Sequence, residues 1–214
     1  MKIVPSLLAE DFDDFVDQLR KAEKFADYVQ IDLMDGDFVP TKSFPPERLN
    51  SIETSLAFEV HLMVRDPLPH IEGMKHPGLR RIIFHVEADG NHAEAVASIQ
   101  ERGLSAGLAI KPETAIEDVR MALERADTLL FLTVDPCCYG SPFKSEVLEK
   151  IAEARPMFPG RTITVDGGVS LDNLNAFHDL GVDSACVGSR IFLTENPEES
   201  YRAFVKRARE LGAD

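Results

Sequence analysis

Two carboxylates, two imidazoles and one amide stand at the ends of short β-rich runs. Gln30 and Asp32 are two residues apart, so on a strand they point to the same side. His61, His85 and Asp166 end three further runs. Each of these residues alone is readily explained as a solvated loop residue or a hydrogen-bonded strand end. Burying them together costs too much free energy for packing alone. Because carboxylates and imidazoles often transfer protons in enzymes, the set predicts one shared catalytic site.

Glycines form a second pattern after the last two β-rich runs. Gly167 and Gly168 follow one run, and Gly188 and Ser189 follow the next. The loops after the seventh and eighth strands of a (β/α)8 barrel often bind phosphate through backbone N–H groups. Tight turns between a strand and a helix also use glycine, so a purely structural explanation stays open. Arg190 would add the local positive charge that a phosphate needs in an acidic protein.

A regular alternation of strand and helix patterns positions these residues. Eight β-rich runs are expected at 2–7, 28–33, 58–63, 82–86, 107–110, 129–134, 162–165 and 184–187. Helical patterns are expected between and after them at 12–24, 93–102, 115–126, 145–154, 171–180 and 197–211. Two further segments, 45–52 and 68–74, are short and polar and match a helix less well.

This alternation predicts an α/β protein with a parallel sheet, either a closed barrel or an open doubly wound sheet. Spread over eight units, the chain has about 27 residues per unit, which is short but sufficient for a (β/α)8 barrel. No G-x-G-x-x-G motif follows the first run, which argues against a dinucleotide-binding sheet. We therefore expect residues 1–214 to form a single (β/α)8 TIM barrel domain with the site at its C-terminal mouth.

Composition limits the partners that the protein can have. The formal net charge of −14 repels polyanions and anionic membrane surfaces, so neither nucleic acid nor a membrane is expected as a partner. The first residues do not resemble a secretory signal, and no apolar run has membrane-spanning length. Cys137, Cys138 and Cys186 lack a Cys-x-x-Cys spacing, and idle thiols are their default interpretation. These features predict a protein of the reducing cytoplasm.

Seven segments, spread in order over nearly the whole chain, carry a resemblance to a known family. They are VPSLL at 4–8, QIDLMDGDFVP at 30–40, HLM at 61–63, HVE at 85–87, TVDP at 133–136, VDGGV at 165–169 and GSRIF at 188–192. Together they resemble the ribulose-phosphate 3-epimerase family, and the second segment is the most specific. The resemblance implies a (β/α)8 barrel that interconverts ribulose 5-phosphate and xylulose 5-phosphate, usually with a divalent metal ion. It also suggests a homo-oligomer.

The resemblance also implies catalytic and metal-binding residues. Inverting a carbon next to a ketone needs one group to remove a proton and another to return one, and Asp32 and Asp166 match the family's pair. Asp32, His61 and Asp166 match ligands of a divalent ion, with Zn²⁺, Fe²⁺ or Mn²⁺ implied. Gln30 stands where the family has its first histidine ligand. Because an amide oxygen binds Zn²⁺ or Fe²⁺ more weakly than imidazole, Gln30 should weaken the metal site or shift it toward oxygen-preferring ions.

Substrate contacts are implied in the same way, at Ser6, Met34, Met63, Gly140, Gly167, Gly168, Gly188 and Ser189. The two methionines are explained equally well as core residues. The loop after the sixth run departs from the family's pattern, because only Gly140 and Phe143 of the segment CCYGSPF at 137–143 match it. Phosphate binding at this loop should therefore be weaker or shaped for another substrate.

Three functions stay open on the sequence alone. The leading hypothesis is an epimerase that acts on ribulose 5-phosphate through an enediolate. A hexulose phosphate such as allulose 6-phosphate is an alternative substrate, since the altered loop changes the pocket. The third hypothesis is a barrel that binds a sugar phosphate without turnover, which Gln30 favours if it prevents metal binding. Asp32 and Asp166 argue against this third function, because a binding protein has no need of two opposed carboxylates.

Overall fold

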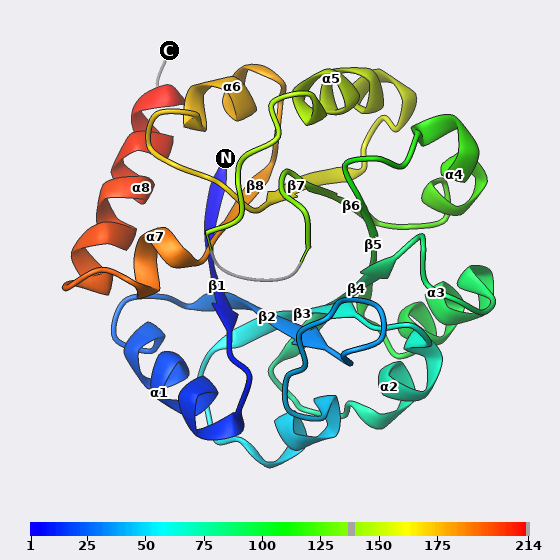
Figure 1. Cartoon of the computed structure of the whole chain (residues 1–214), viewed down its shortest axis with the longest axis horizontal. Coiled ribbons are helices and arrows are strands. Elements are labelled where there is room, and N and C mark those ends of the chain that lie inside the picture. Colours follow the sequence, from blue (N-terminus) through cyan, green and yellow to red (C-terminus); the bar gives the residue numbers. More distant parts are fainter. Residues whose placement is uncertain (137–139, 213–214) are drawn as a thin grey trace.

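Eight parallel strands close into a barrel at the centre of the molecule (Figure 1). The computed structural model describes residues 1–136 and 140–212. The strands are β1 Lys2–Leu8, β2 Tyr28–Met34, β3 Ala57–Met63, β4 Leu79–His85, β5 Ser105–Ile110, β6 Thr128–Leu132, β7 Thr162–Asp166 and β8 Ser184–Val187. Each strand pairs with its neighbours in the sequence, and β8 pairs with β1. The expected (β/α)8 TIM barrel is confirmed.

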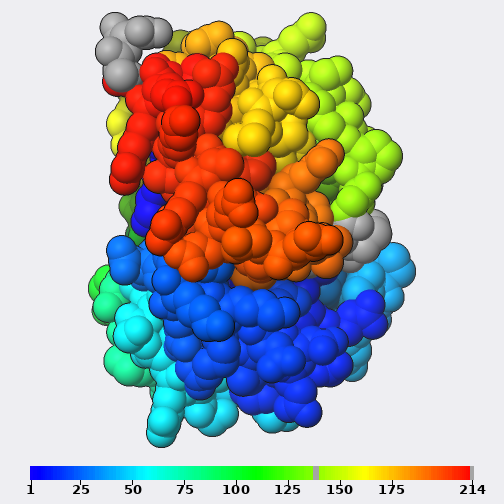
Figure 2. All heavy atoms as spheres, turned by 90° about the vertical axis from the view of Figure 1, so that its left-hand side faces the viewer, coloured from blue at the N-terminus to red at the C-terminus, as the bar shows by residue number. Residues whose placement is uncertain are grey.

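Helices surround the barrel and cover the outer faces of the strands (Figure 1). They are α1 Phe12–Ala22, α2 Pro67–Gly73, α3 His92–Glu101, α4 Ile116–Leu123, α5 Val147–Met157, α6 Leu174–Asp179, α7 Ser189–Phe192 and α8 Pro197–Leu211, with a 3₁₀ helix, η1 Pro46–Ser51, between β2 and β3. Figure 2 shows the side where α8 (red) and α7 (orange) lie next to α1 (blue), and α8 contacts both of them. None of the described helices is long and apolar enough to cross a membrane.

The alternating pattern of β2 explains why the candidate site residues point into the barrel. Its apolar residues pack toward the helices and are fully buried: Val29, Ile31 and Leu33. Gln30 and Asp32 alternate with them and therefore face the barrel interior. The strand register then pairs Asp32 with His61 on β3, and it pairs Asp166 on β7 with Cys186 on β8. Closing the barrel brings these two strand pairs toward one axis.

Element boundaries differ from the expected ones by at most three residues. Helix α6 begins at Leu174 and not at 171, because the Asn173 side chain accepts a hydrogen bond from the Ser170 N–H at 2.8 Å and holds a turn before the helix. The polar segment 45–52 forms η1, which starts at Pro46, where the missing N–H of proline costs nothing. Helix ends depend on such local hydrogen bonds, which hydrophobic periodicity does not reveal.

An ion pair between a buried carboxylate and a partly exposed guanidinium lies on the side of the barrel interior away from the mouth. Arg81 Nη1 donates to Glu59 Oε2 at 2.7 Å, and the Tyr28 hydroxyl donates to the same oxygen at 2.9 Å. Cys186 is a buried free thiol inside the barrel, while Cys137 and Cys138 lie outside the described residues. The polar interior therefore extends from this ion pair up to the mouth.

Candidate active site

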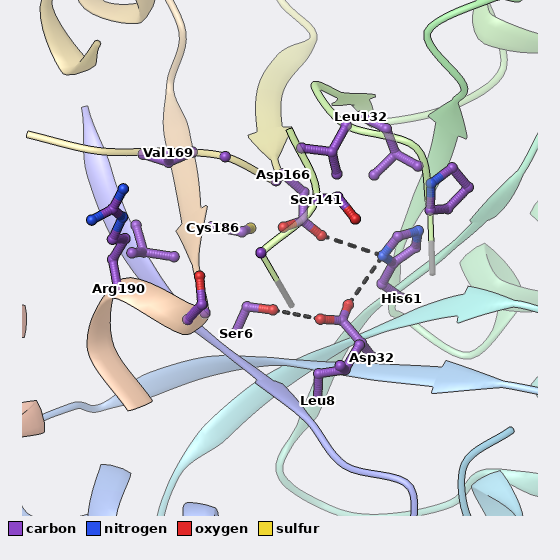
Figure 3. Close-up of a pocket in the computed structure, with 18 of the residues that line it drawn as sticks. Ser6, Leu8, Asp32, His61, Leu132, Ser141, Asp166, Val169, Cys186 and Arg190 are labelled. Carbon is purple, nitrogen blue, oxygen red and sulfur yellow. Dashed lines mark hydrogen bonds and ion pairs between the residues drawn. The ribbon is translucent and has the colours of Figure 1, made fainter. Parts of the chain in front are cut away.

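A pocket lies at the C-terminal mouth of the barrel, and its empty space is about 620 Å³ when the part open to solvent is included (Figure 3). Ten of the residues expected in the site line it: Ser6, Asp32, His61, Met63, Gly140, Asp166, Gly167, Gly168, Gly188 and Ser189. Gln30 and Met34 do not line it. Gln30 is fully buried next to the carboxylates, and Met34 packs against Met63 and Val39. The structure thus brings most of the expected residues together.

The two carboxylates converge from different strands on one amide group. Gln30 Nε2 donates to Asp32 Oδ1 at 2.9 Å and to Asp166 Oδ2 at 2.7 Å. The Ser6 hydroxyl donates to the other oxygen of Asp32, Oδ2, at 2.5 Å. Burial and the nearby charge of Asp166 raise the pKa of Asp32. A carboxyl group with a raised pKa binds a proton more readily, which suits a group that takes up and returns protons.

His61 lies between the two carboxylates. Its Nδ1 is 3.1 Å from Asp32 Oδ1 and 3.5 Å from Asp166 Oδ2, as the dashed lines in Figure 3 mark. Burial alone lowers the pKa of His61, but the hydrogen bonds with Asp166 and Asp32 outweigh burial and raise the pKa to about 9. In the protein without a bound ion, the imidazole therefore carries a positive charge at neutral pH and offsets part of the negative charge of the pair.

A chain of hydrogen bonds leads from His61 to Glu87. His61 Nε2 is 3.0 Å from His85 Nε2, and His85 Nδ1 is 3.0 Å from Glu87 Oε2. Because the Glu87 carboxylate only accepts, His85 carries its proton on Nδ1 and accepts from His61 through Nε2. The Lys111 backbone N–H and the Thr114 hydroxyl donate to the other Glu87 oxygen. The chain fixes the ring of His61. The expected grouping of His61 with His85 is found, but His85 is buried behind His61 and does not line the pocket.

The side chains at the mouth fit a divalent metal ion through three residues. One ligand atom each of Asp32, His61 and Asp166 lies within 4.8 Å of the others. Carboxylate oxygens and an imidazole nitrogen are suitable ligands for Zn²⁺, Fe²⁺ or Mn²⁺. Gln30 is adjacent, but its amide nitrogen faces the carboxylates. Its Oε1 accepts from the Cys186 thiol at 3.1 Å, and burial raises the pKa of that thiol, which stays protonated.

The glycine loops form another side of the same pocket. Gly167 and Gly168 have φ angles of +98° and +59°, which side chains with a Cβ rarely adopt. A Cβ on Gly167 would lie 2.3 Å from Val134 Cγ2, so packing alone also requires glycine there. Arg190 lines the pocket on the side away from His61 (Figure 3). Backbone conformation and packing therefore explain these glycines without a ligand. The glycine loops also line the pocket, together with the cationic side chain of Arg190.

A closed (β/α)8 barrel with acid/base side chains grouped at its C-terminal mouth defines the class of protein as a barrel enzyme. The family model described as "Ribulose-phosphate 3 epimerase family" matches residues 2–192. The chain belongs to this family, and it is an isomerase of the epimerase type.

Individual relatives agree with the family over nearly the full chain. A ribulose-phosphate 3-epimerase of Schizosaccharomyces pombe is 33% identical over 204 residues, which cover 92% of this chain and 90% of that protein. The cytoplasmic isoform of the enzyme in Oryza sativa subsp. japonica is 30% identical over 212 residues, which cover 96% of this chain and 93% of that protein.

Solved structures of other enzymes share the fold. A 3-hexulose-6-phosphate synthase from Salmonella typhimurium has a TM-score of 0.71 and 16% identity, covering 99% of this chain and 100% of that one. KGPDC from Streptococcus mutans has a TM-score of 0.72 and 15% identity, covering 98% of each chain. At these identities the similarity shows the barrel fold alone.

Proposed function

We propose that this protein interconverts ribulose 5-phosphate and xylulose 5-phosphate, a reaction of pentose phosphate metabolism. The proposal rests above all on the convergence of Asp32 and Asp166 on Gln30 Nε2, at 2.9 and 2.7 Å. Two carboxylates from different strands of one pocket supply the two proton-transfer groups that inversion of a carbon requires. The relatives in S. pombe and rice are named ribulose-phosphate 3-epimerase, which supports this substrate.

In the proposed reaction, Asp32 and Asp166 act on opposite faces of the substrate. One carboxylate removes the proton from the carbon next to the ketone, and an enediolate results. The other delivers a proton to the opposite face, so the configuration inverts. Ser6 and Gln30 hydrogen-bond the carboxylates and hold their oxygens in place. The raised pKa of Asp32 lets this group carry the proton between turnovers.

We propose that Asp32, His61 and Asp166 hold a divalent ion, with Gln30 outside the ligand set. Such an ion would supply positive charge to stabilise the enediolate. His85 and Glu87 orient the ring of His61 so that its Nδ1 faces the carboxylates. Because Gln30 replaces the first histidine ligand of the family, the preference should shift from Zn²⁺ toward ions that favour oxygen, such as Mn²⁺.

The phosphate group is proposed to bind at the glycine loops, through Gly140, Gly167, Gly168, Gly188 and Ser189. Backbone N–H groups of such turns bind phosphate without the bulk of a side chain. A protein with a net charge of −14 needs a local cation to hold a dianion, and Arg190 lines this part of the pocket. Met63 would cover the carbon chain of the substrate, with Met34 packed behind it.

The remaining proposals concern the whole molecule. We propose that residues 1–214 act as one barrel domain, since the matched family region spans residues 2–192. A cytoplasmic location is supported by the rice relative, which is named a cytoplasmic isoform. A homo-oligomer is proposed from the family resemblance, and light scattering of the purified protein tests it.

The decisive experiment measures loss of deuterium from the carbon next to the ketone, with each ketose phosphate in turn. We expect fast washout and epimerisation with ribulose 5-phosphate after loading with Mn²⁺, and at least about 10²-fold slower epimerisation in Asp32→Asn. A higher kcat/KM with allulose 6-phosphate would move the assignment to a hexulose phosphate. Binding of both sugar phosphates without washout would show a barrel that binds and does not catalyse.

A further inference from the structure

Both ends of the Gln30 amide are hydrogen-bonded inside the barrel. Its Nε2 donates to Asp32 Oδ1 at 2.9 Å and to Asp166 Oδ2 at 2.7 Å. Its Oε1 accepts from Cys186 Sγ at 3.1 Å. Gln30 and Cys186 are at most 1% exposed, so water does not compete for these bonds. The amide is therefore tied to three side chains from three different strands.

The chemistry of these partners selects one orientation of the amide. Ionised carboxylates only accept hydrogen bonds, so they require the N–H₂ end of Gln30. Turning the amide over would place Oε1 within 3 Å of Asp32 Oδ1 and Asp166 Oδ2, where three acceptors repel one another. The thiol of Cys186 is a weak donor, and the oxygen end of the amide accepts its hydrogen. Both ends thus favour the same orientation.

The position of Cys186 follows from the barrel and not from a flexible loop. Cys186 is the third residue of β8 and pairs with Asp166 in the β7–β8 register. Its Sγ also lies 3.9 Å from Glu59 Oε1, a carboxylate that Arg81 and Tyr28 hold from the other side. The thiol therefore contacts the oxygen end of the Gln30 amide, while the two carboxylates at the mouth contact its nitrogen end.

We propose that Gln30 and Cys186 form a positioning pair for the two carboxylates: the Cys186 thiol holds the Gln30 amide so that its nitrogen clamps Asp32 to Asp166. The pair takes the position where the family resemblance implies a histidine ligand. A role of the pair in catalysis rests on the proposed function, since the pair orients the acid/base groups of that reaction. The hydrogen bonds of the pair themselves do not depend on any substrate.

The pair also has a consequence for metal binding. For Gln30 to offer Oε1 to an ion held by Asp32, His61 and Asp166, the amide must turn and lose its bond to Cys186. The thiol therefore opposes a fourth protein ligand. A net hydrogen bond corresponds to about a fivefold change in an equilibrium, so removing the thiol should raise Zn²⁺ affinity by about this factor.

Two substitutions at one position separate hydrogen bonding from packing. Cys186→Ser keeps a donor but loses volume, whereas Cys186→Val keeps volume but loses the donor. NMR of the metal-free protein, labelled with ¹⁵N-glutamine, measures solvent exchange of the Gln30 side-chain N–H₂, which Gln30→Leu identifies by its disappearance. We expect exchange about fivefold faster in Cys186→Val and within twofold of the parent in Cys186→Ser. Any other pattern in these two variants, measured where both are fully folded, overturns the pair.

Calorimetric titration with Zn²⁺ gives a second readout that needs no activity. Cys186→Val should tighten binding about fivefold when Gln30 is present and should change nothing in the Gln30→Leu background. Equal effects in both backgrounds, including no effect in either, would show that Cys186 does not act through Gln30 and would overturn the proposal. Because both measurements omit substrate, they can support the pair even if the protein fails to turn over ketose phosphates.

Discussion

Asp166→Asn removes a proposed proton-transfer group while it keeps nearly the same side-chain volume. In the folded protein, Asp166 Oδ2 accepts from Gln30 Nε2 at 2.7 Å and lies 3.5 Å from His61 Nδ1. An asparagine oxygen still accepts from Gln30, but it does not take up a proton at neutral pH. The substitution should therefore block inversion of the substrate and leave the barrel folded.

The substitution should lower kcat far more than it lowers the stability of the fold. General acid–base catalysis contributes about 10²- to 10⁴-fold, so kcat should fall by at least about 10²-fold, or ~2.7 kcal/mol in the barrier. A hydrogen bond to a charged acceptor is worth ~1 kcal/mol more than one to a neutral acceptor. For a domain of this size, ~1 kcal/mol corresponds to a Tm decrease of about 2–4 °C. Activity should thus be lost without unfolding.

The assay follows hydrogen exchange at the carbon next to the ketone, for each epimer separately, in D₂O. If each carboxylate serves one face, Asp166→Asn retains exchange with the epimer whose proton Asp32 removes and loses exchange with the other. Asp32→Asn should show the opposite preference. The pH profile adds a check, because removing the Asp166 charge eliminates one of the causes that raise the pKa of Asp32. Exposed Asp172→Asn, in the loop after β7, is the matched control.

Two outcomes would refute the assignment of the pair. Turnover within tenfold of the parent in either folded variant would show that the altered carboxylate is not a proton-transfer group. Exchange with the same epimer in both variants would show that neither carboxylate is the base for that epimer. In either case the hydrogen bonds around Gln30 would describe a structural cluster, and the acid/base groups would have to be sought elsewhere in the pocket.

Three further predictions follow from the same site. Gly188→Val should raise KM for the sugar phosphate far more than it lowers Tm, because a side chain obstructs the proposed phosphate loop; unchanged substrate affinity would move the phosphate elsewhere. Gln30→His should tighten Zn²⁺ binding and raise activity, measured by titration and turnover, and a variant that binds Zn²⁺ well yet stays inert with every ketose phosphate would contradict the epimerase proposal. Without metal, the pKa of His61 is raised from 6.5 to about 9. The protonated imidazole therefore stabilises the fold fully below pH ~6.5, and this stabilisation is lost as the pH rises toward 9. Urea unfolding of the chelated protein should therefore show lower stability at pH 9 than at pH 6, a difference that His61→Gln should diminish.

The number and order of the strands could be predicted from the amino-acid pattern, and so could the face on which the main site residues lie. The two-residue alternation in β2 places Gln30 and Asp32 inside the barrel, and the same period applies to His61 on β3. These features can be predicted because side chains alternate between the two faces of a strand, and burial gives the sequence the same two-residue period. Motif spacing then indicated the family, which the match over residues 2–192 confirms.

The contacts between particular polar atoms depend on the folded barrel and could not be predicted from the strand pattern. Gln30 and Cys186 are 156 positions apart, and only the closure of β8 onto β1 brings the thiol to the amide. The chain from His61 to Glu87 likewise depends on side-chain rotamers packed within the barrel. Met34 shares the inward face of Asp32, yet it packs behind Met63 and does not line the pocket. Periodicity specifies the face of a strand, whereas contact between side chains depends on register, rotamer and the neighbours that fill the same space.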